Sequence, residues 1–214
     1  MITLDHVSKS FGTVPAVCSV SLGIRSAERV GILGPSGSGK TTVLRLIAGL
    51  ETPDAGTIRF DDRCMSTARH VVEPHRRGLG FVFQRPALWP HLTVAQNILF
   101  ALSHLPREEA RRRLDTLAET MEIGGLKQRR PDELSAGQAR RVALARALAP
   151  QPQCVLMDEP LTNLDRELKQ RLLGLIRDTL KTTQAGLIYV SHDDQEVAQV
   201  TDRVVRLAHG RLEE

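Results

Sequence analysis

The stretch "GPSGSGKTTVLRLIAGL", residues 34–50, places Gly34, Gly37, Gly39 and Lys40 directly before an apolar, helix-patterned run. Glycines allow the backbone to turn so that successive N–H groups converge on one point, which forms a nest for an anion. The start of the following helix adds a partial positive charge, and the lysine adds a full one. These residue types in this order predict a phosphate-binding loop. A simple turn leading into a helix is the alternative interpretation.

Residues 34–41 match the pattern GxxxxGK[ST] of a P-loop in full. An apolar run at 29–34 before the loop and the helical pattern after it supply the strand–loop–helix context that the pattern requires. Lys40 is expected to contact the β- and γ-phosphates of a nucleotide, and the Thr41 hydroxyl is a suitable ligand for Mg²⁺. The loop residues expected to bind the nucleotide are Gly34, Pro35, Ser36, Gly37, Ser38, Gly39, Lys40, Thr41 and Thr42.

Reactive side chains follow two later apolar runs. "CVLMD" ends in Asp158 and is followed by Glu159, and "GLIYVSH" ends in His192. In open parallel sheets, ligands bind beyond the carboxyl ends of the strands, so we expect these side chains near the phosphates. Asp158 is placed to hold Mg²⁺ through water, and Glu159 to orient and deprotonate an attacking water. The alternatives are an acidic turn that caps a helix and an ordinary surface or core histidine.

The elements that must position these groups can be read from hydrophobic periodicity. Residues 2–7 and 17–24 alternate as half-buried strands do, with a turn expected at Phe11, Gly12 and Pro15. From about 85 to 150 the pattern is mostly helical, with helices expected at 93–102, 107–121 and 135–149. The remainder returns to strands that alternate with helices. This order favours an α/β fold, in which helices pack on a parallel sheet.

Composition and charge limit the class of protein. With 214 residues, 41% hydrophobic and 25% charged, the chain is expected to form one globular domain, with room for an inserted lobe. The net charge of +4 suits a polyanionic ligand as well as nucleic acid or an anionic membrane. The basic runs, which include Arg140 and Arg141, are interpreted mainly as solvated faces, so nucleic-acid binding is not expected.

Cysteine usage and hydropathy bear on location. The three cysteines form no pair and no metal-ligand cluster with the histidines, which fits a reducing compartment. No run approaches the roughly 18 apolar residues that a membrane span needs, and the N-terminus does not resemble a signal peptide. We therefore expect a cytoplasmic protein that reaches a membrane only through a partner.

The segment "LSAGQARRVALARALA", residues 134–149, contains a second helix start. Ser135 is a candidate N-cap, and Gln138 three residues later completes a capping box. Residues 135–137 therefore lie at a helix N-terminus shaped for an anion. An ordinary capped helix would satisfy the same spacing.

This segment resembles the signature motif, usually LSGGQ, of the ATP-binding cassette (ABC) ATPases, with Ala136 in place of a glycine. The resemblance covers essentially the entire chain. Phe11 resembles the A-loop aromatic that stacks on adenine, although Tyr is more usual there and a core position is the alternative. Gln84 resembles the Q-loop glutamine, and His192 resembles the H-loop histidine. "MDEPLTNLD", residues 157–165, is similar to a Walker B motif that runs into a D-loop, which is more commonly of the "SALD" type.

The resemblance implies a P-loop NTPase core with a mainly parallel sheet, an N-terminal antiparallel β subdomain and an inserted helical subdomain. It implies one ABC ATPase domain over residues 1–214, in which 1–84 and 150–214 form the core and 85–149 the helical subdomain. Because the chain stops soon after its last expected strand, no C-terminal regulatory domain is expected.

The resemblance also implies ATP and Mg²⁺ as cofactors and a head-to-tail dimer. The signature helix of one copy would close on the γ-phosphate held by the partner's P-loop, with contacts from Ser135, Ala136, Gly137 and Gln138. Thr41, Gln84 and Asp158 would bind Mg²⁺, and Gln84 would couple the site to the helical lobe. Lys40, Glu159 and His192 would be catalytic, and Asp165 would reach across the dimer.

Residues 85–102 resemble the Q-loop region of bacterial importer ATPases for anions, metals, polyamines or thiamine-like solutes. This implies an energy-coupling subunit that docks through these residues on a separate membrane permease, on the inner face of the cell membrane, in a system with a solute-binding protein.

Other classes of function are alternatives. Soluble ABC proteins that act on the ribosome or DNA usually carry two cassettes or a long insertion, neither of which is present. A P-loop GTPase would carry the pattern NKxD, which is absent, and a small-molecule kinase would not need the signature helix. A non-catalytic ATP-binding scaffold would not need the set Lys40, Asp158, Glu159 and His192.

Overall fold

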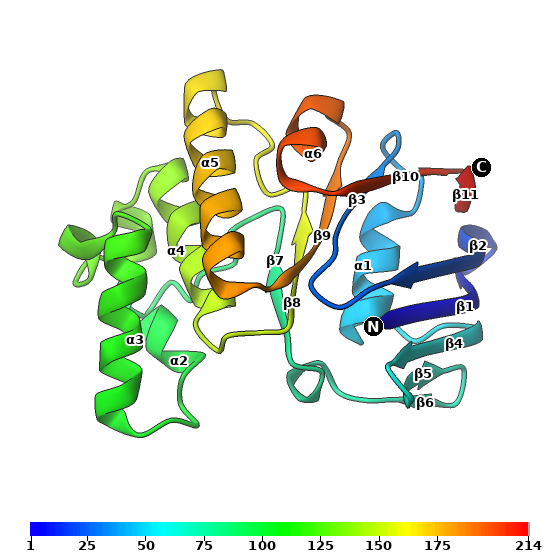
Figure 1. The fold of residues 1–214 in the computed structure, drawn as a ribbon, viewed down its shortest axis with the longest axis horizontal. Coiled ribbons are helices and arrows are strands. Elements are labelled where there is room, and N and C mark those ends of the chain that lie inside the picture. Colours follow the sequence, from blue (N-terminus) through cyan, green and yellow to red (C-terminus); the bar gives the residue numbers. More distant parts are fainter. Residues whose placement is uncertain (214) are drawn as a thin grey trace.

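The computed structural model describes residues 1–213, which form two β-sheets and the helices around them (Figure 1). The smaller sheet has the strand order β2-β1-β4-β5-β6, and its strand pairs are antiparallel. Its strands are β1 (Ile2–Phe11), β2 (Val14–Ile24), β4 (Ala55–Phe60), β5 (Arg63–Thr67) and β6 (His70–Val71). The expected N-terminal antiparallel β subdomain is therefore present.

The larger sheet has the order β11-β10-β3-β9-β8-β7. All of its neighbouring strands are parallel except the pair β10–β11. Its strands are β3 (Arg29–Leu33), β7 (Leu79–Val82), β8 (Cys154–Asp158), β9 (Gly186–Ser191), β10 (Arg203–Ala208) and β11 (Arg211–Glu213). Every residue of β8 and β9 is buried, as is typical of parallel strands that are covered on both faces. The prediction of a mainly parallel sheet is confirmed.

The helices divide into two groups. α1 (Lys40–Ala48) packs between the two sheets, where Leu44, Leu46 and Ile47 share one hydrophobic core with residues of both. α2 (Val94–Phe100), α3 (Arg107–Thr120) and α4 (Ala136–Leu148) lie at the opposite end of the molecule from the antiparallel sheet (Figure 1). They form a second core with the larger sheet and with α5 (Arg166–Thr183) and α6 (Asp194–Val200). Three short 3-10 helices complete the fold, namely Pro74–Arg76, Gly124–Leu126 and Pro131–Glu133.

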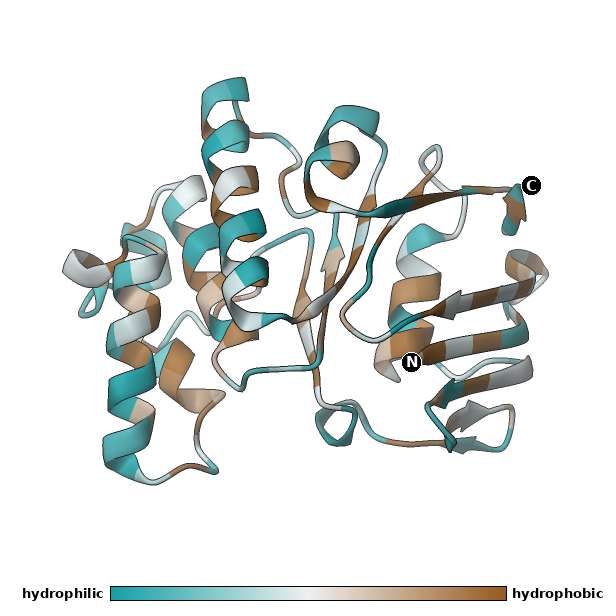
Figure 2. Cartoon of the chain, in the orientation of Figure 1, coloured by the Kyte–Doolittle hydropathy of each residue, from teal (hydrophilic) through white to brown (hydrophobic). Residues whose placement is uncertain are grey.

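Hydropathy follows this arrangement. Figure 2 shows hydrophobic positions concentrated in the central strands and in α1, whereas α3 is largely hydrophilic. The residues of α3 that are buried, Ala110, Leu114 and Ala118, lie at spacings of four and form its inner face. Among residues 1–213, no helix combines the length and the apolar character that crossing a lipid bilayer demands.

The first two strands are longer than the periodicity predicted. They continue to a tight turn at Gly12, and Pro15 lies inside β2, paired with Ser10, rather than in the turn. Register shifts interrupt the alternation of inward- and outward-facing side chains along β1. His6 and Ser19 have positive φ, at 47° and 53°. Since β2 lies at the edge of its sheet, the missing N–H of the proline is tolerated there.

Candidate nucleotide-binding site

The loop between β3 and α1 is shaped by two glycines with positive φ. Gly37 has φ 79° and Gly39 has φ 103°, in the left-handed region that other residues rarely adopt. A Cβ on Gly39 would also lie 2.2 Å from the carbonyl oxygen of Ala16, so this position requires glycine. Gly39 is the N-cap of α1 and supplies no side-chain cap. The first N–H groups of α1 are therefore left to an external acceptor.

Lys40 is the first residue of α1, and its side chain is 4% exposed. Its Nζ donates hydrogen bonds to the carbonyl oxygens of Gly34, at 2.7 Å, and Pro35, at 2.8 Å. It also lies 3.8 Å from Oε1 of Glu159. Burial lowers the pKa of Lys40, while the carboxylates of Glu159 and Asp158 act in the opposite direction. The loop thus holds an ammonium group at its centre.

Thr41 and Asp158 bring two oxygen ligands together. The Thr41 hydroxyl donates a hydrogen bond of 2.8 Å to Oδ1 of Asp158, at the end of β8. Burial raises the pKa of Asp158, and the hydrogen bond from Thr41 partly offsets this shift. A hydroxyl and a carboxylate suit Mg²⁺, which commonly takes one or two protein ligands and completes its shell with phosphate and water. No cluster of three or more His, Cys, Asp or Glu in residues 1–213 offers a metal site of its own.

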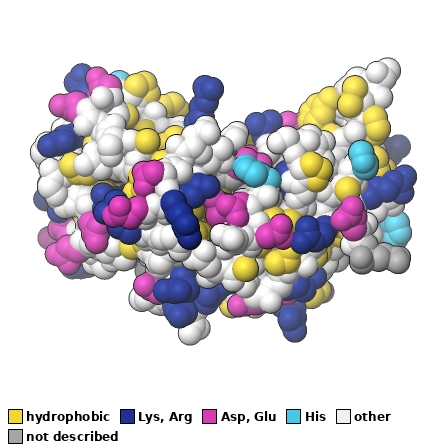
Figure 3. Space-filling view, turned by 90° about the horizontal axis from the view of Figure 1, so that it is seen from above, with side chains coloured by type: hydrophobic (Ala, Val, Ile, Leu, Met, Phe, Trp, Pro, Cys, Tyr) yellow, Lys and Arg dark blue, Asp and Glu magenta, His cyan; other side chains and the backbone are white. Residues whose placement is uncertain are grey.

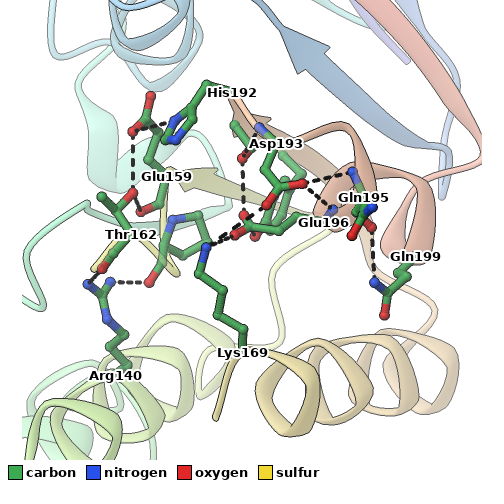
Figure 4. A network of polar contacts seen from close by, with 12 residues as sticks. Arg140, Glu159, Thr162, Lys169, His192, Asp193, Gln195, Glu196 and Gln199 are labelled. Carbon is green, nitrogen blue, oxygen red and sulfur yellow. Dashed lines mark hydrogen bonds and ion pairs between the residues drawn. The ribbon is translucent and has the colours of Figure 1, made fainter. Parts of the chain in front are cut away.

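Glu159 and His192 face each other across the ends of β8 and β9 (Figure 4). Nδ1 of His192 lies 3.4 Å from Oε2 of Glu159, which also accepts a hydrogen bond of 3.3 Å from the Thr162 hydroxyl. The backbone of Glu159 has φ 42°, and its N–H donates to the carbonyl oxygen of Val190. This hydrogen bond to β9 holds Glu159 in a left-handed conformation that costs energy for a residue other than glycine.

A cavity of about 280 Å³ brings together Phe11, Gln84 and Glu159 with several residues of the loop and the start of α1. It is lined by Phe11, Ala16, Ser36, Gly37, Gly39, Lys40, Thr41, Thr42, Gln84 and Glu159. Phe11 is 47% exposed at its rim, so the alternative that Phe11 is a core residue is wrong. Ser38 is buried under the loop, where its carbonyl oxygen accepts the N–H of Gly210.

A larger cavity of about 840 Å³ lies elsewhere, between α3 and α5, and contains none of these groups. Its size does not make it the functional site, because it lacks a phosphate-binding loop and the carboxylates at the strand ends.

The signature segment does not line the 280 Å³ cavity of its own chain. Ser135 caps α4 in the expected capping box: its Oγ accepts from the N–H of Gln138, and Gln138 Oε1 accepts from the N–H of Ser135. Ser135 and Ala136 are exposed. Gly137 is buried, and a Cβ there would lie 2.8 Å from the Leu168 side chain of α5. The helix end thus packs on α5 and presents Ser135 to the outside.

Asp165 likewise has a local role, since its Oδ1 accepts the N–H of Leu168 and caps α5. Nothing within the single chain brings Asp165 into the cavity.

Sequence reasoning missed Arg140. Its guanidinium donates to the carbonyl oxygens of Gln84, at 3.1 Å, Thr162, at 2.6 Å, and Pro160. Burial lowers the pKa of Arg140, so this residue is not part of a solvated basic face. It links the signature helix to the glutamine of the cavity and to the turn after Glu159. Arg140 lies on the same face of α4 as the buried Gly137 and Leu144, three residues after the first and four before the second, and no local pattern of the sequence marked its role.

The family model described as "ABC transporter" matches residues 17–162. The chain is 43% identical to the sulfate/thiosulfate import ATP-binding protein CysA of Vibrio cholerae, with 100% of this chain and 57% of CysA covered. It is 42% identical to the glucose import ATP-binding protein GlcV of Saccharolobus solfataricus, with 99% of this chain and 61% of GlcV covered. The chain thus spans about three fifths of the length of these curated relatives.

Among solved structures, the chain is similar to the ATP-binding cassette MJ0796 in its dimeric post-hydrolysis state bound to ADP and Pi. The TM-score is 0.88 and the sequence identity 32%, and the match covers 100% of this chain and 97% of the other. With a family model that matches more than half of its residues and a fold shared over its full described length, the chain belongs to the ABC transporter family.

Proposed function

We propose that this chain binds and hydrolyses ATP as the energy-coupling subunit of an ABC importer. One observation carries the proposal: Lys40, Thr41 and Glu159 line one cavity. Asp158 accepts the hydrogen bond of Thr41, and His192 lies 3.4 Å from Glu159. The named relatives of the chain are import ATP-binding proteins, and a similar solved cassette is described with ADP and Pi.

Each group has a role in this proposal. The loop amides and Lys40 bind and neutralise the β- and γ-phosphates, and Phe11 stacks on the base at the rim of the cavity. Glu159 orients a water molecule whose oxygen attacks the γ-phosphorus, and it takes a proton from that water as the bond to the leaving ADP oxygen breaks. His192 contacts the γ-phosphate. Mg²⁺, held by Thr41, Asp158 and Gln84, would neutralise phosphate charge.

A second copy of the chain completes the site in this proposal. Ser135 and Ala136 are exposed at the start of α4 and do not reach the cavity of their own chain. We infer that Ser135, Ala136, Gly137 and Gln138 serve the cavity of a partner, with Asp165 at the same interface. The description of MJ0796 as a dimer supports this arrangement.

We also infer a permease as partner, docked on residues 85–102 of the helical subdomain 85–149. Trp89 and Phe100 are 45% and 60% exposed in this segment, and their ring centroids are 5.9 Å apart. Two exposed aromatic side chains in contact are typical of a protein interface. The chain would thus sit peripherally on the inner face of a cell membrane, with a solute-binding protein in the same system.

Nucleic acid is not expected as a partner. On the face that Figure 3 shows, Lys and Arg side chains are interspersed with Asp and Glu, which does not favour nucleic acid as a ligand of that face.

The direct test is ATP hydrolysis by the purified protein. We expect turnover that Lys40→Ala abolishes, because one preorganised phosphate contact in such a site is worth roughly 10²–10³ in rate. The matched control is Lys181→Ala, at an exposed lysine of α5. Unchanged turnover in Lys40→Ala would contradict the proposed site.

The proposed partner is tested separately. Trp89→Ala with Phe100→Ala should prevent co-purification with an integral membrane protein while ATP hydrolysis persists, and Leu50→Ser, at another exposed apolar residue, is the control. Co-purification of the wild-type chain with ribosomes or DNA instead would favour the soluble alternative.

A further inference from the structure

A buried carboxylate lies beside the segment that carries His192, and the proposed mechanism does not use it. Glu196, in the first turn of α6, has a side chain that is only 6% exposed. Its carboxylate accepts three hydrogen bonds, from Lys169 Nζ at 2.7 Å, from the Tyr189 hydroxyl at 3.1 Å and from the Ser191 hydroxyl at 3.0 Å. A buried charge is tolerated when it is paired and hydrogen-bonded in this way.

These bonds hold the residues on both sides of His192. The Ser191 hydroxyl donates to Glu196 and at the same time accepts the N–H of Asp193 at 3.0 Å. Asp193 Oδ1 in turn accepts the N–H of Gln195 and of Glu196, which fixes the start of α6 (Figure 4). The His192 side chain itself is 55% exposed. Because little packing holds the ring, its direction depends on the backbone that these bonds fix.

Lys169 connects the Glu196 carboxylate to α5. It lies in α5, the helix that Asp165 caps. Its Nζ also lies 4.0 Å from Oδ2 of Asp193. The Glu196–Lys169 ion pair therefore joins the helix that follows the D-loop-like segment to the strand end that carries His192.

We propose that Glu196 is a positioning residue: held by Lys169, it fixes Ser191 and thereby directs His192 toward Glu159. The distance of 3.4 Å between His192 Nδ1 and Glu159 Oε2 is the geometry that this network maintains. The inference rests on the proposed ATPase function for its catalytic meaning, while the orientation of His192 can be measured without turnover.

The effects expected of Glu196 variants distinguish a role in orienting His192 from a role in stabilising the fold. In Glu196→Ala, kcat for ATP hydrolysis falls roughly tenfold or more, since small misplacements of a reacting group have large effects on rate. The Kd for ATP stays within about twofold, because the loop at residues 34–41 and Lys40, which bind the phosphates in the proposal, are unaltered. The NMR resonances of the His192 ring, assigned by their loss in His192→Ala, shift in the nucleotide-free protein. Glu196→Gln keeps an acceptor for Ser191 and recovers part of the rate.

Lys169→Met removes the other partner while keeping the aliphatic chain, and it should repeat the effects of Glu196→Ala in weaker form. If Glu196→Ala fails to fold, kcat and the His192 ring resonances can be measured in Glu196→Gln and Lys169→Met instead.

Glu28→Gln is a matched control. The Glu28 side chain is also 6% exposed, and it pairs with Arg203 at 2.8 Å and accepts the N–H of Arg25, away from the cavity. We expect it to lower the melting temperature and to leave kcat and the His192 resonances unchanged.

Two results overturn the proposal: Glu196 variants with wild-type kcat, or variants whose kcat falls while the His192 resonances stay in place. An inactive wild-type protein would instead refute the proposed function, and the His192 resonances would still decide whether Glu196 positions the ring.

Discussion

Thr41 and Asp158 are 117 positions apart in the sequence, and a hydrogen bond of 2.8 Å joins the threonine hydroxyl to the carboxylate. It connects the first turn of α1 to the end of β8, so the loop proposed to bind phosphate and the strand end that carries the carboxylate are held in a fixed relative position. Such preorganisation avoids the cost of assembling the site at the moment of reaction.

This buried carboxylate should make stability depend on pH. Burial raises the pKa of Asp158 in the folded protein above its ordinary value of 3.8. The folded state therefore holds the proton more tightly than the unfolded state, and stability is lost as the pH rises through the folded pKa. We expect Asp158→Asn, without nucleotide or Mg²⁺, to raise the melting temperature at neutral pH. The rise should be about 2–4 °C for each kcal/mol by which the substitution removes the cost of burying the charged carboxylate.

The gain in melting temperature for Asp158→Asn should shrink toward pH 4, as Asp158 becomes protonated in both states. Circular dichroism melts between pH 4 and pH 7.5 measure this, with Asp178→Asn in the exposed part of α5 as control. A gain in melting temperature that does not vary with pH would show that burial of the charged Asp158 carboxylate is not its cause.

Arg140 should affect hydrolysis without affecting ATP affinity. Its guanidinium donates to the carbonyl oxygens of Gln84 and Thr162 and makes no contact with the loop at residues 34–41. Arg140→Met is expected to lower kcat by roughly 10- to 100-fold, because the cavity glutamine and the turn after Glu159 lose their common anchor. Isothermal titration should give an unchanged Kd for ATP. A loss of affinity with unchanged kcat would show that the anchor acts on binding instead.

Arg77 should be a determinant of stability rather than activity. It is 5% exposed, and it donates to the carbonyl oxygens of Val72, Ile47 and Met65 and to the Ser66 hydroxyl. Burial lowers its pKa to about 10. Arg77→Met leaves these buried acceptors without a donor, so we expect the free energy of unfolding to fall by about 3 kcal/mol.

Urea denaturation measures this loss, and the Kd for ATP of folded Arg77→Met should match that of the wild type. A variant as stable as the wild type would show that water replaces the guanidinium.

The parts of the site that local chemistry specifies could be predicted from the sequence. The left-handed Gly39, the burial of Lys40 and the cap at Ser135 follow from residue type and spacing within a few positions. The apolar runs at 29–34, 154–158 and 186–192 correctly indicated β3, β8 and β9 of the larger sheet. The β1–β2 hairpin was underestimated because register shifts break the two-residue period.

Contacts that depend on tertiary packing could not be predicted from local patterns. Arg140, Lys169 and Glu196 are ordinary charged residues of helices until the fold brings carbonyl oxygens and hydroxyls to them. The left-handed backbone of Glu159 is equally invisible in the sequence, since its N–H is bound to β9, which comes later in the chain.

In the proposed dimer, the cavity of one chain is closed by the Ser135 end of α4 of the other chain. Glu159→Gln should bind ATP without hydrolysing it and so accumulate the closed state, which sedimentation equilibrium detects by mass. With ATP we predict a particle of twice the 23.6 kDa mass of the chain, and a return to monomer when Ser135→Arg is added. A Glu159→Gln variant that is saturated with ATP and remains at 23.6 kDa would contradict the account.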